Sequence, residues 1–242
     1  MNKSPVVVTS AHTRIGFNVA QSLIRAGHPV VAVGRYRPTM CAGLDRVVAE
    51  YAHGDPFEDS TRYVNLLLEV ASRHGTNLIF PVHEEIYAIA EHADAIRSRQ
   101  VQVCGPSLRH LLQLHDKANV SRFVEQTGVP FPCTVVPDGA DDLDEVLSVI
   151  GPSFIVKPRW GSGTSGVVRV AGTDAVNALR ALWRREKPGR RYVVQELVPG
   201  CGAGVGVLVH AGQVVACGGH KRVREVPISG GTSTARVNRP VF

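Results

Sequence analysis

Residues 154–167 read FIVKPRWGSGTSGV, and the rest of the chain is best interpreted outward from this stretch. It combines an apolar run that ends at Lys157 with a loop of three glycines and three hydroxyl residues. Glycines let backbone N–H groups approach phosphate oxygens, hydroxyl groups add donors, and a lysine supplies a compact positive charge. The stretch therefore predicts a polyphosphate-binding loop, and the alternative is an ordinary glycine-rich hairpin loop.

The loop differs from two other phosphate-binding sequences. A Walker A loop would place a lysine and a serine or threonine after the last glycine, whereas Val167 follows Gly166 here. A dinucleotide fingerprint would lead into a helix, whereas the run from Val167 onward reads as another strand. We therefore expect the loop to join two strands.

Two further segments accompany the loop. Asp116 and Lys117 stand at the start of an expected helix over residues 116–128, and the sequence VPFP after it forces an extended exit, because proline fixes φ and lacks an N–H. Residues 193–200, VVQELVPG, read as an apolar strand that ends in an acidic residue and a turn.

Taken in this order and at these separations, the segments resemble the ATP-grasp superfamily, and most of all its carbamoyl-phosphate-synthetase-like and related carboxylate–amine ligases. Each motif alone is weak, but the ordered set is specific. The resemblance covers nearly the whole chain, since such proteins also carry a Rossmann-like domain ahead of the grasp.

The resemblance implies roles for individual residues. Lys117 and Lys157 would contact ATP phosphates or the adenine edge, unless Lys117 is only a surface lysine. The flexible lid over the phosphates would consist of Gly161, Ser162, Gly163, Thr164, Ser165 and Gly166. The hinge strand, whose backbone hydrogen-bonds adenine, would consist of Gln195, Glu196, Leu197 and Val198.

A later basic segment, residues 220–227, resembles the family segment that holds phosphate or the acyl-phosphate intermediate. On this reading Lys221 and Arg222 are the catalytic candidates. The alternative is that Lys221, Arg222 and Arg224 form a solvated strand face, and Glu196 in the hinge could likewise only cap a turn.

The implied activity is that of an ATP-dependent ligase of the carbon–nitrogen bond-forming type. Such an enzyme activates a carboxylate as an acyl phosphate, lets an amine or similar nucleophile displace phosphate, and releases ADP. The implied cofactors are ATP and Mg2+. The family closes its second lobe with an acidic strand and a Glu-x-Asn segment that binds magnesium; residues 238–242 contain no such segment, so the metal ligands are expected outside this chain.

Two alternatives stay open. The chain could be a truncated or degenerate ATP-binding module without turnover on its own. It could also be an NAD(P)-dependent reductase, because residues 9–16, TSAHTRIG, resemble part of a short-chain dehydrogenase phosphate loop. The expected glycine spacing and a Tyr-xxx-Lys pair are missing, which disfavours the reductase.

The predicted fold class is α/β plus α+β, a Rossmann-like parallel-sheet domain followed by an ATP-grasp domain with an incomplete second lobe. Alternating strands and helices before residue 115 predict a parallel sheet covered by helices on both faces. The expected strands there are 6–9, 29–33, 78–82 and 101–104, with helices around 15–23, over 61–74 and over 84–97. The expected domains are 1–115, 116–190 for the first lobe and lid, and 191–242 for the start of the second lobe.

The later part predicts antiparallel hairpins. The expected strands are 133–136, 154–157, 167–170, 192–198, 205–210 and 214–217, with a hairpin turn at 210–213 and helices over 143–150 and 174–185.

The amino-acid composition indicates which kinds of partner the protein can bind. The 242 residues are 44% hydrophobic and carry a net charge of +6, which suits a folded protein with an anionic partner. Five cysteines without a CxxC pair favour a reducing, cytoplasmic setting, and no apolar run approaches the roughly 20 residues of a membrane span. The arginines of residues 180–191 suit a helix end better than a nucleic-acid surface. The expected partners are ATP and small carboxylate and amine substrates, with no nucleic acid, no membrane, and a homodimer left open.

Overall fold

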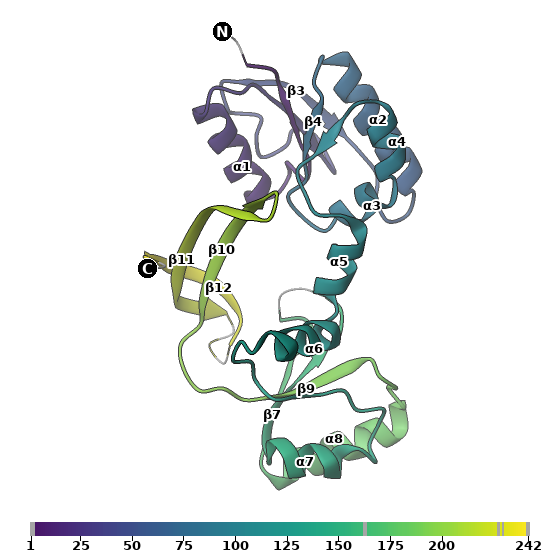
Figure 1. The fold of residues 1–242 in the computed structure, drawn as a ribbon, viewed down its shortest axis with the longest axis vertical. Coiled ribbons are helices and arrows are strands. Elements are labelled where there is room, and N and C mark those ends of the chain that lie inside the picture. The colour runs from purple at the N-terminus through teal and green to yellow at the C-terminus, as the bar shows by residue number, and fades with distance from the viewer. Residues whose placement is uncertain (1–2, 162–163, 227, 229, 241–242) are drawn as a thin grey trace. The chain divides into compact units, whose positions relative to one another are not determined.

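The computed structural model describes residues 3–161, 164–226, 228 and 230–240 (Figure 1). The chain divides into two compact units, Met1–Leu112 and Gln113–Phe242, and each is considered by itself. None of the helices in the described residues combines the length and apolar character that a bilayer span requires.

Unit 1 contains a five-stranded sheet in which every strand pair is parallel. The strand order is β3-β2-β1-β4-β5. The predicted parallel sheet is therefore confirmed, although the edge strand β3 was not predicted. The strands are β1 (Val6–Val8), β2 (Val30–Gly34), β3 (Val47–Ala52), β4 (Leu78–Phe80) and β5 (Gln102–Val103).

Helices cover both faces of this sheet, with α1 on one side and α2 and α4 on the other (Figure 1). Val6, Val7 and Val8 are all buried, although side chains alternate between the faces of a strand. Val6 and Val8 pack in the core that includes α1, and Val7 packs in the core that includes α2. The helices of this part are α1 (Arg14–Arg25), α2 (Ser60–Arg73), α3 (Ile86–Glu91), α4 (Ala93–Ser98) and α5 (Leu108–His115).

One helix prediction in unit 1 is wrong. Residues 84–97 do not form a single helix, because the backbone leaves the helical region at His92 (φ −104°, ψ 23°) and separates α3 from α4. The short helix α5 was not predicted.

Unit 2 begins with a four-stranded antiparallel sheet in the order β6-β9-β7-β8. Phe154, Val156 and Val194 point from it into a core with α7 and α8, and α6 lies toward the opposite face in Figure 1. The elements are α6 (Lys117–Thr127), β6 (Thr134–Val135), α7 (Leu143–Ile150), β7 (Ser153–Pro158), β8 (Val168–Ala171), α8 (Thr173–Glu186) and β9 (Tyr192–Glu196).

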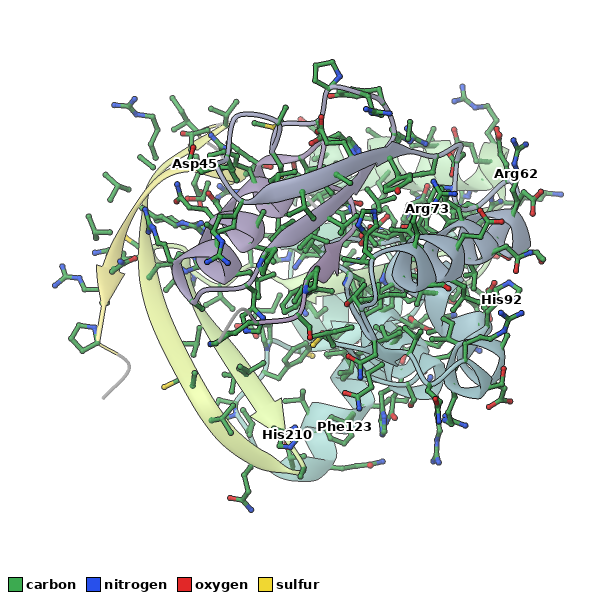
Figure 2. All side chains as sticks on the ribbon, turned by 90° about the horizontal axis from the view of Figure 1, so that it is seen from above. Asp45, Arg62, Arg73, His92, Phe123 and His210 are labelled. Carbon is green, nitrogen blue, oxygen red and sulfur yellow. The ribbon has the colours of Figure 1, made fainter. Side chains whose placement is uncertain are left out.

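The remaining strands form a separate antiparallel sheet, β10-β11-β12. The predicted hairpin turn is confirmed: His210 pairs with Gln213, and Ala211 and Gly212 both have positive φ, as a tight two-residue turn requires. Figure 2 labels His210 at this turn. The second hairpin strand is much longer than residues 214–217, and β12 was not predicted. The strands are β10 (Ala203–His210), β11 (Gln213–Val226) and β12 (Thr232–Arg239).

Candidate functional site

The candidate site is built around the first turn of α6. The Asp116 side chain caps this helix by accepting a hydrogen bond from the Ala118 N–H at 3.0 Å. Asp and Asn are favoured at this position because they satisfy an otherwise unpaired donor. The helix ends at Gly128, whose φ of 71° suits glycine. The cap places Lys117 at the first helical position.

A buried ion pair ties this turn to the end of β7. Arg159 Nε donates to Asp116 Oδ1 at 3.0 Å, and Arg159 Nη2 donates to the second carboxylate oxygen. Asp116 is only 3% exposed. Burial alone would raise the pKa of this carboxyl, but the hydrogen bonds from Arg159 and Ala118 and the nearby positive charge outweigh it and lower the pKa.

Lys117 holds the start of the glycine loop. Its backbone N–H donates to the Arg159 carbonyl at 3.0 Å, and its Nζ donates to the Gly161 carbonyl at 3.0 Å. The Gly161 N–H in turn donates to His115 Nε2 at 3.3 Å. His115 and Lys117, which flank Asp116, therefore contact both backbone polar groups of Gly161.

Lys157 lies on the sheet face opposite the α7 and α8 core. Its Nζ donates to Gln195 Oε1 at 2.6 Å, and Gln195 Nε2 donates to Thr134 Oγ1 at 2.9 Å, which fixes the orientation of the amide. Burial lowers the pKa of Lys157, and the charge of Lys117 lowers it further. Burial also lowers the pKa of Lys117, against an opposing effect of Asp116. The two ammonium groups are thus electrostatically coupled.

The glycine loop joins two antiparallel strands, as expected. Gly161 and Gly166 both have positive φ, and a Cβ on Gly166 would lie 2.7 Å from the Pro158 ring, so this glycine is required for the loop to fold back on β7. Thr164 is half-buried and Ser165 is exposed. Ser162 and Gly163 lie outside the described residues.

The predicted hinge residues divide between strand and turn. β9 ends at Glu196, so Leu197 and Val198 follow the strand, which is shorter than predicted. Glu196 follows Gln195 and therefore points to the other face, where its Oε2 accepts from the Cys133 N–H at 3.2 Å.

Lys221 and Arg222 lie on β11, in the other sheet of this unit. Lys221 is exposed. Arg222 Nη1 donates to Glu225 Oε1 at 3.0 Å and to the Gly231 carbonyl at 3.1 Å, so the interactions of this guanidinium group are within its own hairpin. Pro227, the last residue of the predicted basic segment, lies outside the described residues.

Sequence reasoning did not anticipate the part played by Asp116, Arg159 and His115. Asp116 and Arg159 are 43 residues apart, and Arg159 stands inside the quoted motif without an evident partner. An acidic residue directly before a predicted helix indicates a cap, but nothing local indicates its second bond.

The described residues contain no group of three or more His, Cys, Asp and Glu side chains suited to a metal ion.

Comparison with known proteins identifies the fold. No protein-family model matches the chain. N5-carboxyaminoimidazole synthetase from Staphylococcus aureus, in complex with ADP, superposes with a TM-score of 0.65 at 13% sequence identity. The match covers 91% of this chain and 57% of the synthetase chain. The biotin carboxylase domain of Hydrogenobacter thermophilus 2-oxoglutarate carboxylase, with MgADP and bicarbonate, superposes with a TM-score of 0.67 at 16% sequence identity. The match covers 92% of this chain and 51% of the carboxylase chain.

Sequence comparison finds related enzymes over shorter stretches. Acetyl-CoA carboxylase 1 from Oryza sativa subsp. japonica is 24% identical over 156 residues, which is 55% of this chain and 7% of that enzyme. A probable alpha-L-glutamate ligase from Xanthomonas oryzae pv. oryzae is 30% identical over 93 residues, which is 36% of this chain and 30% of that enzyme. The chain therefore spans about half the length of these solved structures and less of the curated relatives.

The chain has the fold of these solved structures, which is an ATP-grasp fold, so the predicted fold is confirmed. The solved neighbours and curated relatives named above are synthetases, carboxylases and ligases. They lend no support to the reductase alternative.

Proposed function

We propose that this chain binds ATP through Lys117, Lys157, the glycine loop and the hinge at the end of β9, as part of a ligase that activates a carboxylate. The observation that carries the proposal is the pair of coupled lysines. Their hydrogen-bond acceptors, the Gly161 and Arg159 carbonyls and the Gln195 amide oxygen, are all neutral. Burial lowers the pKa of both lysines, and the charge of Lys117 lowers that of Lys157 further, so a bound polyanion would stabilise both ammonium groups.

The surrounding groups suit the rest of a nucleotide. The loop from Gly161 to Gly166 can present backbone N–H groups and hydroxyls to phosphate oxygens. In this proposal residues 195–198 receive the adenine edge, and Lys221 and Arg222 stabilise the charge of the transferred phosphoryl group. We keep the expected domain division in this proposal. Residues 1–115 form the first domain, residues 116–190 the first lobe with its lid, and residues 191–242 the start of the second lobe.

The reaction follows from the acyl-phosphate chemistry expected of this fold. A carboxylate oxygen attacks the γ-phosphorus of ATP, and the bond to the ADP oxygen breaks. The amine nitrogen then attacks the acyl carbon, loses a proton, and displaces phosphate. Lysine charges placed at the phosphates would act by binding and by stabilising the developing negative charge.

Further parts of the proposal concern partners and setting. We assign small carboxylate and amine substrates, a cytoplasmic setting, and magnesium as the companion of the nucleotide, as in the MgADP complex named above. No residue of the described chain is assigned to the metal. A homodimer is also proposed, since one solved neighbour is a domain dimer.

The direct test is a Lys157→Ala variant studied by calorimetric titration with Mg-ATP. Removing one charge-assisted contact, worth about 1.5–3 kcal/mol, should weaken binding about 10- to 100-fold. Arg169→Ala, which removes an exposed cation from the neighbouring strand β8, is the matched control and should bind normally. Unchanged affinity in a folded Lys157→Ala protein would refute the proposed site.

Binding and turnover need separate experiments. Release of ADP with a panel of amino acids distinguishes a ligase from a module that binds ATP without turnover. Thermal protection by Mg-ATP but not by NADPH would exclude the reductase alternative.

A further inference from the structure

Unit 2 contains a cavity whose described lining includes none of the residues assigned above to ATP. Its volume is about 650 Å³. Most of its lining residues come from α6 and from the segment that connects α6 to β6. Volumes of about 300–1,000 Å³ are typical of small-molecule sites. Its described lining includes neither Lys117, Lys157, Gly161 nor Gln195, and it adjoins the candidate nucleotide site through Arg159 and Thr134, which bond to Lys117 and Gln195.

Three arginines line this cavity from three separate parts of the chain. Arg122 comes from α6, Arg159 follows β7, and Arg190 precedes β9. Among the described residues that line the cavity, one, Glu125, has an acidic side chain. Planar guanidinium groups recognise carboxylates and phosphates through paired N–H donors.

Among the described residues, the three arginines differ in how closely a carboxylate pairs with them. Arg159 is paired with Asp116, but Arg122 donates to the Ala118 carbonyl at 3.2 Å and to the Asn119 amide oxygen at 2.6 Å, which are both neutral. The Arg190 side chain is 63% exposed and forms a long ion pair of 3.8 Å with Asp138, which is itself exposed, so solvent weakens this pair. The cavity therefore has positive charge available for an anion.

The segment that connects α6 to β6 contributes apolar side chains to the lining. Val129 and Phe131 line the cavity and are exposed, at 58% and 38%. Side chains of this kind gain free energy when an apolar ligand covers them. We propose that the cavity is a second ligand site, for a small carboxylate with an aromatic or branched apolar body. This inference rests on the cavity alone and does not require the proposed ATP-dependent activity.

The chain contains its own reporter for this test. Cys133 lines the cavity and is exposed, while Cys104 and Cys201 are exposed cysteines outside its described lining. The experiment is to measure the alkylation rate of each cysteine by neutral iodoacetamide, using mass spectrometry, without nucleotide. Benzoate serves as the probe ligand, and benzyl alcohol is its uncharged counterpart.

Benzoate should slow the alkylation of Cys133 at least about fivefold near saturation and leave Cys104 and Cys201 unchanged, with a dissociation constant in the millimolar range expected of so small a ligand. Arg122→Gln should weaken this protection about tenfold or more, while Arg169→Gln should retain it. Arg190→Gln, at an exposed position, supplies the same test if Arg122→Gln does not fold.

Three results would overturn the inference: no protection up to about 50 mM benzoate, equal protection by benzyl alcohol, or equal slowing at all three cysteines. Because no nucleotide is present, any of these results would leave the proposed ATP site untouched. Conversely, normal ATP binding by Lys157→Ala would refute that site without bearing on this cavity.

Discussion

At the scale of single residues, the Asp116 carboxylate has two structural roles. It caps α6 and pairs with Arg159, and an Asp116→Asn substitution separates them because asparagine is an equally good cap but carries no charge. Removing one partner of a buried ion pair typically costs about 3–5 kcal/mol. We expect a loss in that range in the free energy of unfolding, measured with urea.

The matched control is Asp144→Asn. Asp144 pairs with Arg180 at 2.7 Å but its side chain is 76% exposed, and exposed pairs contribute about 0–1 kcal/mol. If both substitutions cost the same, the pair with Arg159 is not what holds the first turn of α6.

A histidine pair in unit 1 predicts acid sensitivity. The rings of His12 and His53 lie 6.4 Å apart, and burial lowers the pKa of both below the ordinary value of 6.5. Because these histidines are more easily protonated in the unfolded chain, the unfolded state binds more protons below about pH 6.5, and stability falls as the pH decreases. His53→Asn should flatten this slope in urea unfolding measured between about pH 5 and 7; an unchanged slope would contradict the assignment.

Residue-level prediction from sequence works where the chemistry is local. Lys117, Lys157 and the glycine loop are recognisable because each motif is contiguous, and the structure brings Lys117 and Gly161 together. The Asp116–Arg159 pair and the orientation of Gln195 depend on contacts across the sheet, which no local pattern specifies. The nucleotide-binding roles of these residues stay predictions.

At the scale of elements, the start of α1 depends on one glycine. A Cβ on Gly16 would lie 2.5 Å from the Ser10 carbonyl oxygen, so Gly16→Ala must displace backbone. Overpacking of this kind typically costs about 1–3 kcal/mol. Gly43→Ala is the control, because nothing lies within 4 Å of its added Cβ. Urea unfolding should show a clear loss for Gly16→Ala and little change for Gly43→Ala; similar effects would argue against close packing at α1.

Element prediction failed where tertiary pairing overrides local preference. β3 lies at the sheet edge, where its residues are half-buried or exposed, and Glu50 interrupts the kind of apolar run that marks β1 and β2. The predicted strand ended at residue 217 because Gly218 and Gly219 follow, and a solvated strand face was only the alternative for the charged residues after them. Pairing with β10 on one side and β12 on the other nevertheless keeps β11 extended.

At the scale of the whole molecule, the sheet β10-β11-β12 presents much apolar surface. Val205, Val207, Val214, Val215 and Val223 are each exposed on it. Exposed valines beside the free edges of a sheet favour association between chains. We expect this chain to self-associate as its concentration rises, and Val207→Thr with Val215→Thr to reduce light scattering. Val168→Thr, on β8, is the control and should change little.

The division into a parallel α/β part and an antiparallel part was predictable because hydrophobic periodicity changes along the chain. The exposure of the valines on the last sheet was not predictable, since periodicity shows which side chains are apolar and not whether another element buries them.

The contact between Arg159 and Trp160 gives the chain an optical property. The guanidinium carbon lies 4.6 Å from the centre of the indole ring, directly before Gly161. The chain has two tryptophans, and Trp183 is only 3% exposed whereas Trp160 is 50% exposed. Replacing Trp183 with phenylalanine would leave Trp160 as the single tryptophan, directly before the glycine loop. The wavelength and intensity of its fluorescence emission would then report movement of the loop in real time, without any added dye.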